Sequence, residues 1–273
     1  MQALELESPE LLRAHLGEGR QLYQPLPDSQ GALRWQRLEA GSALPFAAPE
    51  EPPQFAAKAF FFAEREALFR YEHGRFIALL PEPQPQVLFG LSACDLTAIA
   101  YQDRFFADDP HYQLRRGATL LVGVDCAHSC RHGFCARMDS GPDVRPAPAD
   151  LILSRLDAHW LLLVASAAGE QALAGLALPA AAPGWVHERA ANAQRVAAEQ
   201  GEQPAIAAGI PACMPASRRK PAATTPAPAR ASACSASGIT SSARPLPSAS
   251  AAMAAWVAAA AMRSAPEASA CTR

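Results

Sequence analysis

Lysine is almost absent from this chain of 273 residues: Lys58 and Lys220 are the only lysines among its 24 basic residues, and the others are arginine. The formal net charge of −2 gives no electrostatic footprint for nucleic acid or for an anionic membrane surface. A long apolar run is missing too, because the most apolar late segment, residues 251–262, is too short to cross a bilayer. We therefore expect no nucleic-acid partner and no membrane span.

The N-terminus lacks the features of a secretory signal peptide. MQALELESPE carries glutamates in place of a basic start and an apolar segment. This absence predicts a cytoplasmic protein. In a reducing cytosol, clustered cysteines bind metal or take part in redox chemistry more often than they form disulfides.

Four of the seven cysteines lie between residues 90 and 142. Cys94 occurs in GLSACDL, and the stretch VDCAHSCRHGFCARMDSGP holds Cys126, Cys130 and Cys135. The other three are scattered along the last third of the chain: Cys213, Cys234 and Cys271. Because four thiolates complete the ligand set of a zinc ion or of an iron–sulfur cluster, we take the first four as candidate metal and cofactor ligands.

Both parts of this cysteine set follow predicted strands. Residues 87–91 and 118–124 are predicted to be short buried strands, and Asp95 is expected to cap a helix over residues 96–106. Cys94 then lies at a strand-to-helix junction, where the positive end of the helix favours a thiolate. Open α/β sheets place their sites just past the carboxyl ends of strands, so the two parts are expected to meet there.

The segment from residue 126 to residue 142 has no apolar period and is predicted to be a loop. A loop of this length is hard to order without cross-links, which a bound metal would supply.

The remaining pattern predicts a mixed sheet with flanking helices, in the α+β or α/β class. A helix over residues 8–17 is expected to start at Ser8 and Pro9 and to place Leu11, Leu12 and Leu16 on one face. The aromatic stretch 55–71 is predicted to form core strands before a hairpin turn at His73 and Gly74. Further predicted elements follow in the order strand 151–156, strand 160–165, helix 169–176 and helix 185–200.

The composition changes abruptly near residue 200. The last 73 residues are rich in Ala, Pro and Ser, have only Glu202 and Glu267 as acids, and lack Asp, Phe, Tyr and His. Such a composition does not specify a packed core. It indicates either a flexible tail or a coding sequence read out of frame.

The genetic code favours the second interpretation. Read from the third base of each codon, AMAAWVAAAAMRSA at residues 252–265 is compatible with HGCVGCGRCDAVCP. Met253 and Trp256 force two of its glycines, whereas the cysteines are permitted and not forced. The shifted reading has the Cys-x2-Cys-x2-Cys-x3-Cys-Pro spacing of bacterial ferredoxins, which bind 4Fe-4S clusters.

Several motifs between about residues 45 and 175 resemble the iron–sulfur electron-transfer subunit family of anaerobic sulfite reductases, to which the beta subunit of sulfhydrogenases also belongs. The residues that carry this resemblance are Lys58 to Phe62, Cys94-Asp95-Leu96, Asp103, Tyr112, Arg115, Arg116, Cys126, Phe134-Cys135, Met138 and Gly141-Pro142.

The resemblance implies a subunit that relays electrons through 4Fe-4S clusters without itself making or breaking bonds. Its partners would be flavin-containing and catalytic subunits of a redox complex. Family members normally carry two ferredoxin-type cysteine sets after this domain, and the tail of this chain has none.

The family usually has Cys-Phe-Cys where this chain reads Gly133-Phe134-Cys135. We therefore expect Cys130 to act as the fourth ligand, although Asp95 or a histidine is an alternative. The implied organisation is an N-terminal helix and connector (1–45), an α/β iron–sulfur-binding domain (46–183), a helical segment (184–200) and the tail (201–273).

Two other interpretations of the cysteines stay open. A structural zinc ion would use Cys126, Cys130 and Cys135 with Cys94, His128 or His132, and would make the chain a structural or interaction module. A nucleophilic Cys94 would need a histidine base, and no histidine has a sequence position that argues for this role.

Overall fold

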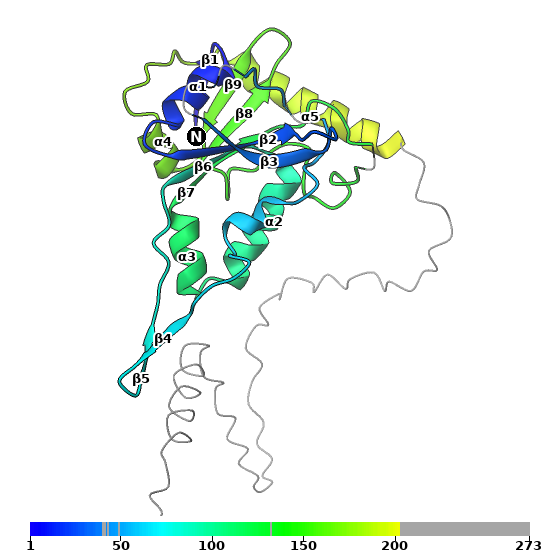
Figure 1. Cartoon of the computed structure of the whole chain (residues 1–273). Helices are drawn as coiled ribbons and strands as arrows, with labels where there is room; N and C mark the ends of the chain where they lie inside the picture. Colours follow the sequence, from blue (N-terminus) through cyan, green and yellow to red (C-terminus); the bar gives the residue numbers. More distant parts are fainter. Residues whose placement is uncertain (40–41, 43, 49, 132, 203–273) are drawn as a thin grey trace, which may run out of the picture. The chain divides into compact units, whose positions relative to one another are not determined.

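The computed structural model describes residues 1–202, apart from residues 40–41, 43, 49 and 132. The predicted out-of-frame tail, residues 203–273, lies outside the described residues. The described residues form one compact unit, in which a seven-stranded sheet has the order β1-β9-β8-β7-β6-β2-β3 (Figure 1).

The helices and strands follow one another along the chain with these bounds: β1 Gln2–Leu6, α1 Pro9–Leu16, β2 Gln21–Pro27, β3 Leu33–Leu38, a 3-10 helix η1 Ala57–Phe60, β4 Phe69–Glu72, β5 Arg75–Ala78, β6 Gln86–Leu91, α2 Ala93–Phe105, α3 Pro110–Gly117, β7 Thr119–Val124, β8 Leu151–Arg155, β9 Trp160–Val164, α4 Ala167–Ala172 and α5 Gly184–Glu202.

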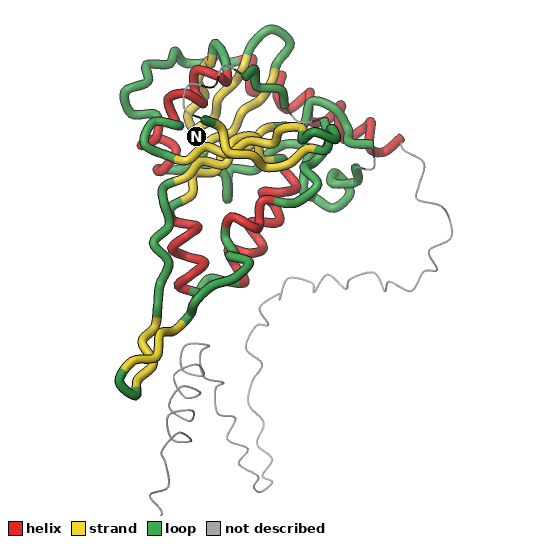
Figure 2. Tube along the Cα trace, viewed as in Figure 1, coloured by secondary structure: helices red, strands yellow, loops and turns green. Residues whose placement is uncertain are grey.

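The sheet is mixed. Its centre is parallel, since β2 pairs with β6, β6 with β7 and β7 with β8 in parallel, whereas β3, β9 and β1 join in antiparallel fashion. Every residue of β7 is buried, as expected for a strand covered on both faces. The predicted fold class, a mixed sheet with flanking helices, is confirmed (Figure 2).

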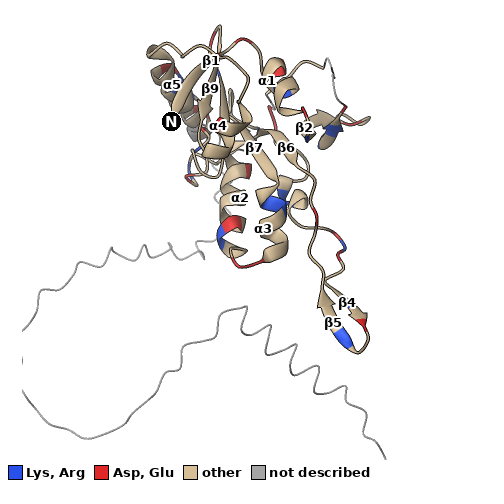
Figure 3. Ribbon diagram, turned by 90° about the vertical axis from the view of Figure 1, so that its left-hand side faces the viewer, with Lys and Arg blue, Asp and Glu red and all other residues tan. Residues whose placement is uncertain are grey.

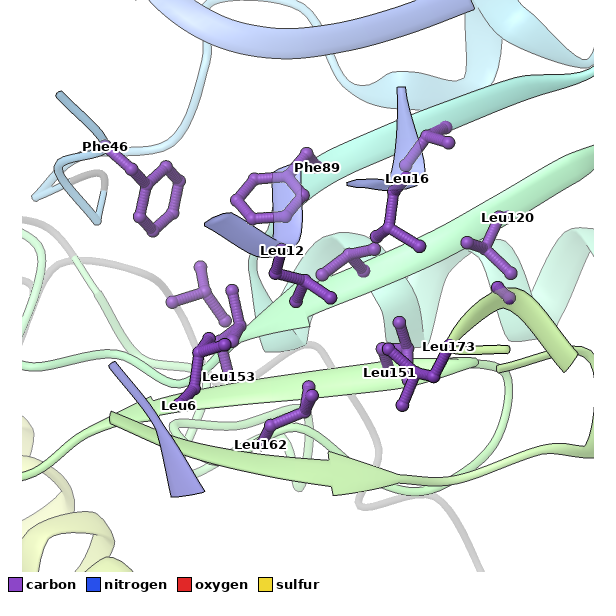
Figure 4. Packing of buried hydrophobic residues seen from close by; sticks show 14 of the residues in the cluster. Leu6, Leu12, Leu16, Phe46, Phe89, Leu120, Leu151, Leu153, Leu162 and Leu173 are labelled. Carbon is purple, nitrogen blue, oxygen red and sulfur yellow. The ribbon is translucent and has the colours of Figure 1, made fainter. Parts of the chain in front are cut away.

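Each face of the sheet has its own apolar core. On one face, α1 and α4 cover side chains such as Phe89, Leu151 and Leu162 (Figure 4). On the other face, α2 and α3 contribute Leu96, Ile99 and Tyr112 to a second buried cluster. The sheet therefore holds the start of α2, and with it Cys94, in a fixed place.

Helix α1 begins as predicted, because the Ser8 side chain accepts a hydrogen bond from the backbone N–H of Leu11 and Pro9 opens the first turn. Leu12 and Leu16 are fully buried, but Leu11 is exposed, so one of the three expected core positions was wrong. The side chains at positions 11, 12 and 16 are spread around a wider arc of the helix than the part that faces the core, so one of them is left in solvent.

The first 45 residues contribute three strands to the sheet, where the sequence indicates only a helix and a connector. Strands β2 and β3 carry Gln, Arg and Pro between their apolar residues, which hides their period. Helix α3 was not predicted, because its first residues have the composition of a polar turn. In the structure, Asp109 caps this helix and Pro110 is its first residue.

The aromatic stretch 55–71 does not form core strands, which corrects the prediction. It forms η1, irregular chain and β4, which pairs with β5 in a separate two-stranded hairpin. Phe61 is buried against Tyr112, whereas Phe69, Tyr71 and Phe76 are exposed on the hairpin that extends from the sheet in Figures 1 and 3. The predicted turn is confirmed, since His73 and Gly74 both have positive φ.

None of the helices in the described part of the chain is long and apolar enough to cross a membrane.

Candidate functional site

Cys94 is the second residue of α2, immediately after β6. The helix is capped by Ser92, whose side chain accepts the backbone N–H of Asp95, so the prediction that Asp95 is the cap was wrong. The Ser92 hydroxyl also lies 3.2 Å from the sulfur of Cys94. Burial raises the pKa of the Cys94 thiol, which outweighs the effect expected from the helix end.

The close approach of α2 to the sheet depends on Gly123 in β7. A Cβ atom at this position would lie 2.7 Å from Leu96 Cδ1 and 2.8 Å from Val144 Cγ1. A side chain there would push α2 and the segment around Val144 away from β7. The missing side chain thus helps to set the position of Cys94.

The other three thiols lie in the irregular segment that follows β7, as predicted. This loop is closed at its base, because the N–H of Cys126 donates to the carbonyl oxygen of Pro142 at 3.2 Å. Inside it, Gly133 N–H donates to Cys130 O at 2.9 Å, and Ser140 N–H donates to Cys135 O at 2.9 Å. Local turns of this kind order the loop around its cysteines without helix or strand.

Helix α5 fixes the base of the loop through Asp125, the residue before Cys126. Arg189 donates to both carboxylate oxygens of Asp125, at 2.6 and 3.0 Å, and also to the carbonyl oxygen of Val144 at 2.8 Å. The same carboxylate accepts the N–H of Val144 and the hydroxyl of Ser154. A two-pronged ion pair that is mostly buried holds both ends of the loop to one helix.

The last turns of α5 hold the rest of the loop. Glu199 accepts the N–H of Ser129 at 3.0 Å, and Arg195 donates to the carbonyl oxygen of Ala127 at 3.0 Å. Gln200 accepts the N–H of Ala136 at 2.8 Å and donates its amide N–H to the sulfur of Cys135 at 3.0 Å. These contacts join the loop to side chains from the last turns of α5.

Gly141 brings the loop against the start of α2. A Cβ atom on Gly141 would lie 3.1 Å from Cβ of Ala93 and 3.5 Å from the sulfur of Cys135. Ala93 is the residue before Cys94. Cys135 therefore lies beside the helix turn that carries Cys94, although 41 positions of sequence separate them.

The four cysteines are half-buried, are not joined in disulfides and influence one another electrostatically. Burial, followed by the neighbouring Cys130, Cys135 and Cys94, raises the pKa of Cys126 to about 12. Burial and then Cys135 raise the pKa of Cys130 as well. The raised pKa values favour the protonated form of Cys94, Cys126 and Cys130, and a soft cation would have to displace these protons to bind.

The donor chemistry fits a thiolate-bound metal, but the thiols are not arranged around a single point. Within the described residues, no three Cys, His, Asp or Glu side chains converge closely enough to hold a metal ion. Zinc requires such convergence, since Zn–S bonds of about 2.3 Å place two sulfurs roughly 3.8 Å apart. A zinc ion would therefore have to draw these side chains together on binding, whereas a 4Fe-4S cluster takes each thiolate on a different iron atom.

The histidines named for the zinc interpretation fall in different places. His128 lines a cleft of about 280 Å³ beside Cys126, together with Arg155, Arg189 and Asn192. His132 lies outside the described residues. The nucleophile interpretation loses support, because Cys94 contacts the Ser92 hydroxyl and its pKa is raised, the reverse of an activated thiol.

Sequence reasoning missed the residues that hold the cysteines in place, namely Arg189, Arg195, Glu199 and Gln200. The sequence predicts the helix over residues 185–200, yet its pattern does not say what the helix covers. Gln200 is buried near the end of a helix that is otherwise mostly polar, and no pattern in a single sequence indicates that a glutamine there is buried.

Comparisons with known proteins give one distant relative and leave the family open. The chain is 29% identical over 117 residues to "Sulfhydrogenase 2 subunit beta" of Pyrococcus furiosus, which covers 42% of this chain and 34% of that protein. The chain thus spans about a third of this relative. No protein-family model and no solved structure matches. The similarity supports a distant relation to sulfhydrogenase beta subunits.

Proposed function

We propose that this chain is an electron-transfer subunit that binds a 4Fe-4S cluster through Cys94, Cys126, Cys130 and Cys135. The observation that carries the proposal is the meeting of thiols from two adjacent strand ends in one half-buried region. A bound cluster would supply a carrier for one electron at a time.

The four thiols would divide the work of holding the group. Cys94 presents its sulfur from a helix end that the sheet fixes in place, and the loop supplies the other three. The burial that raises the pKa of the thiols would also exclude water from the bound group. The hydrogen bond that Gln200 donates to the sulfur of Cys135, and the contact between the Ser92 hydroxyl and the sulfur of Cys94, would orient these ligands.

Cys130 is the proposed substitute for the cysteine that the resembling family has at position 133. A Cβ atom on Gly133 would lie only 3.4 Å from Cβ of Cys130. The side chain of Cys130 therefore leaves the backbone close to the point from which a cysteine side chain at position 133 would leave it. This nearness supports Cys130 over Asp95 or a histidine as the fourth ligand.

The partners are proposed from the resemblance and from the name of the distant relative, which is a subunit of a sulfhydrogenase. They would be flavin-containing and catalytic subunits of a cytoplasmic redox complex, on which substrates such as sulfite, polysulfide or hydrogen react. This chain would contribute no bond-making step of its own.

The test is anaerobic purification of the full chain followed by absorption spectroscopy and metal analysis. A thiolate-bound cluster gives a brown protein with a broad band near about 400 nm that bleaches on reduction. A colourless protein with about one zinc and no iron would instead support the second candidate, a zinc-stabilised structural module, which the four-thiol donor set also favours. A protein that holds neither metal would rule out both.

A further inference from the structure

Gln200, near the end of α5, is the best-placed side chain to control one of the four cysteines. It is only 3% exposed, and it makes two hydrogen bonds to the cysteine loop. One bond joins its Oε1 atom to the N–H of Ala136 at 2.8 Å, and the other joins its Nε2 atom to the sulfur of Cys135 at 3.0 Å.

The orientation of the Gln200 amide is fixed by its partners. A backbone N–H can only donate, so the N–H of Ala136 must face the amide oxygen. The NH₂ group then has to face the sulfur of Cys135. Cys135 consequently receives a hydrogen bond from a buried, uncharged donor.

Gly133 leaves the space that this amide occupies. A Cβ atom on Gly133 would lie 3.2 Å from Nε2 of Gln200, closer than most side-chain contacts. A cysteine at position 133, the residue usual in the resembling family, would press on the amide. The glycine at position 133, where the resembling family usually has cysteine, therefore makes room for the contact between Gln200 and Cys135.

We propose that Gln200 is a positioning residue that holds the sulfur of Cys135 and, through its N–H···S hydrogen bond, raises the reduction potential of the bound cluster. The part of this inference that concerns the reduction potential rests on the proposed function. Added electron density in a reduced cluster is shared with the ligand sulfurs, so a donor aimed at a sulfur stabilises the reduced form more than the oxidised form.

The experiment compares Gln200→Met and Gln200→Glu with the same two changes at Gln194, which lies on α5 but is exposed. Gln200→Met removes the N–H donor without adding charge, and Gln200→Glu removes it and adds a negative charge. In the anaerobic full chain, the midpoint potential is measured by a titration followed by electron paramagnetic resonance.

Both Gln200 variants should lower the potential, with Gln200→Glu showing the larger shift. The expected effect of Gln200→Met is a threefold to tenfold change in the ratio of oxidised to reduced cluster at a fixed potential, about 30 to 60 mV for one electron. The Gln194 variants should not differ from the wild type, because water and salt screen their charge. Unchanged potentials in both Gln200 variants would overturn the inference while leaving the proposed function intact.

A second readout uses the iron-free protein. Alkylation of each cysteine is followed by mass spectrometry. Gln200→Met should slow the reaction of Cys135 at least threefold relative to Cys94, because the reactive thiolate loses its N–H donor, whereas Gln194→Met should not. If the wild type holds no iron, the proposed function fails, and this rate still decides whether Gln200 holds Cys135. Equal rates in the wild type and in Gln200→Met would overturn that contact.

Discussion

Cys94 and the loop of residues 126–142 place their thiols by opposite means. Cys94 sits in a regular helix whose first turn is capped by Ser92 and whose inner face is packed on the sheet. The described part of the loop, all but residue 132, has no helix or strand and is held by its own turns and by side chains of α5. Local sequence and the apolar core determine the first position, whereas contacts from a distant helix determine the others.

The difference implies that the two parts respond differently to mutation. Changes near Cys94 should act through the stability of the core. Changes near the loop should act through its anchors and through any bound metal, because an irregular loop of this length gains much of its order from cross-links.

The largest expected effect comes from removing a ligand. Cys94→Ser and Cys126→Ser should each abolish the iron content and the visible band of anaerobic protein, since both parts of the site are needed to complete one ligand set. Cys213→Ser serves as the matched control and should leave both unchanged. Full iron content in Cys94→Ser would mean that the loop binds metal without the helix.

The next test concerns the fourth ligand. Cys130→Ser should lose most of its iron. The double variant Cys130→Ser with Gly133→Cys should recover part of it, because a Cβ atom at position 133 would lie 3.4 Å from Cβ of residue 130. Iron per chain is the measurement. Recovery should be incomplete, as a side chain at position 133 presses on Gln200. If Cys130→Ser alone keeps its iron, another residue is the fourth ligand.

Breaking the main anchor of the loop should have a moderate effect. Arg189→Met leaves the mostly buried carboxylate of Asp125 without its cation and should cost about 2 to 3 kcal/mol of unfolding free energy, measured by urea denaturation of the metal-free protein. Arg195→Met, on the same helix but exposed, should change it by less than about 0.5 kcal/mol. Equal costs would mean that burial of the pair makes no difference.

The smallest expected effect lies on the regular side of the comparison. Gly123→Ala adds a methyl group that overlaps Leu96 and Val144, and should lower the unfolding free energy by about 1 to 2 kcal/mol, measured by the same urea denaturation. Gly117→Ala is the control, because among the described residues no atom outside its own helix and its chain neighbours lies within 4 Å of the added Cβ, and it should be nearly neutral. A neutral Gly123→Ala would show that α2 does not pack as closely on β7 as described.

The parts of the fold that the sequence predicts well are those with strong local signals. Ser8 and Pro9 mark the start of α1, and the apolar runs that become β6 and β7 are bounded by polar residues, so each predicted element agrees with the structure within a residue or two. The prediction fails where tertiary contacts decide. Aromatic residues from 55 to 71 suggest strands, but Phe61 finds its place beside Tyr112 and Phe69 stays exposed.

The candidate site divides in the same way. Its four cysteines and their position after two adjacent strands follow from spacing and strand prediction. Their anchors do not, because nothing local in a polar helix tells that Arg189 meets Asp125 or that Gln200 meets Cys135. Such pairs depend on how the chain returns to the sheet after β9.

The most direct test of the central claim, that helix and loop together hold one cluster, is the iron-to-protein ratio after anaerobic reconstitution of the full chain with iron and sulfide. We expect about four iron atoms per chain in the wild type and almost none in Cys94→Ser. A wild-type chain that takes up no iron, or a Cys94→Ser chain that takes up as much as the wild type, would contradict the claim.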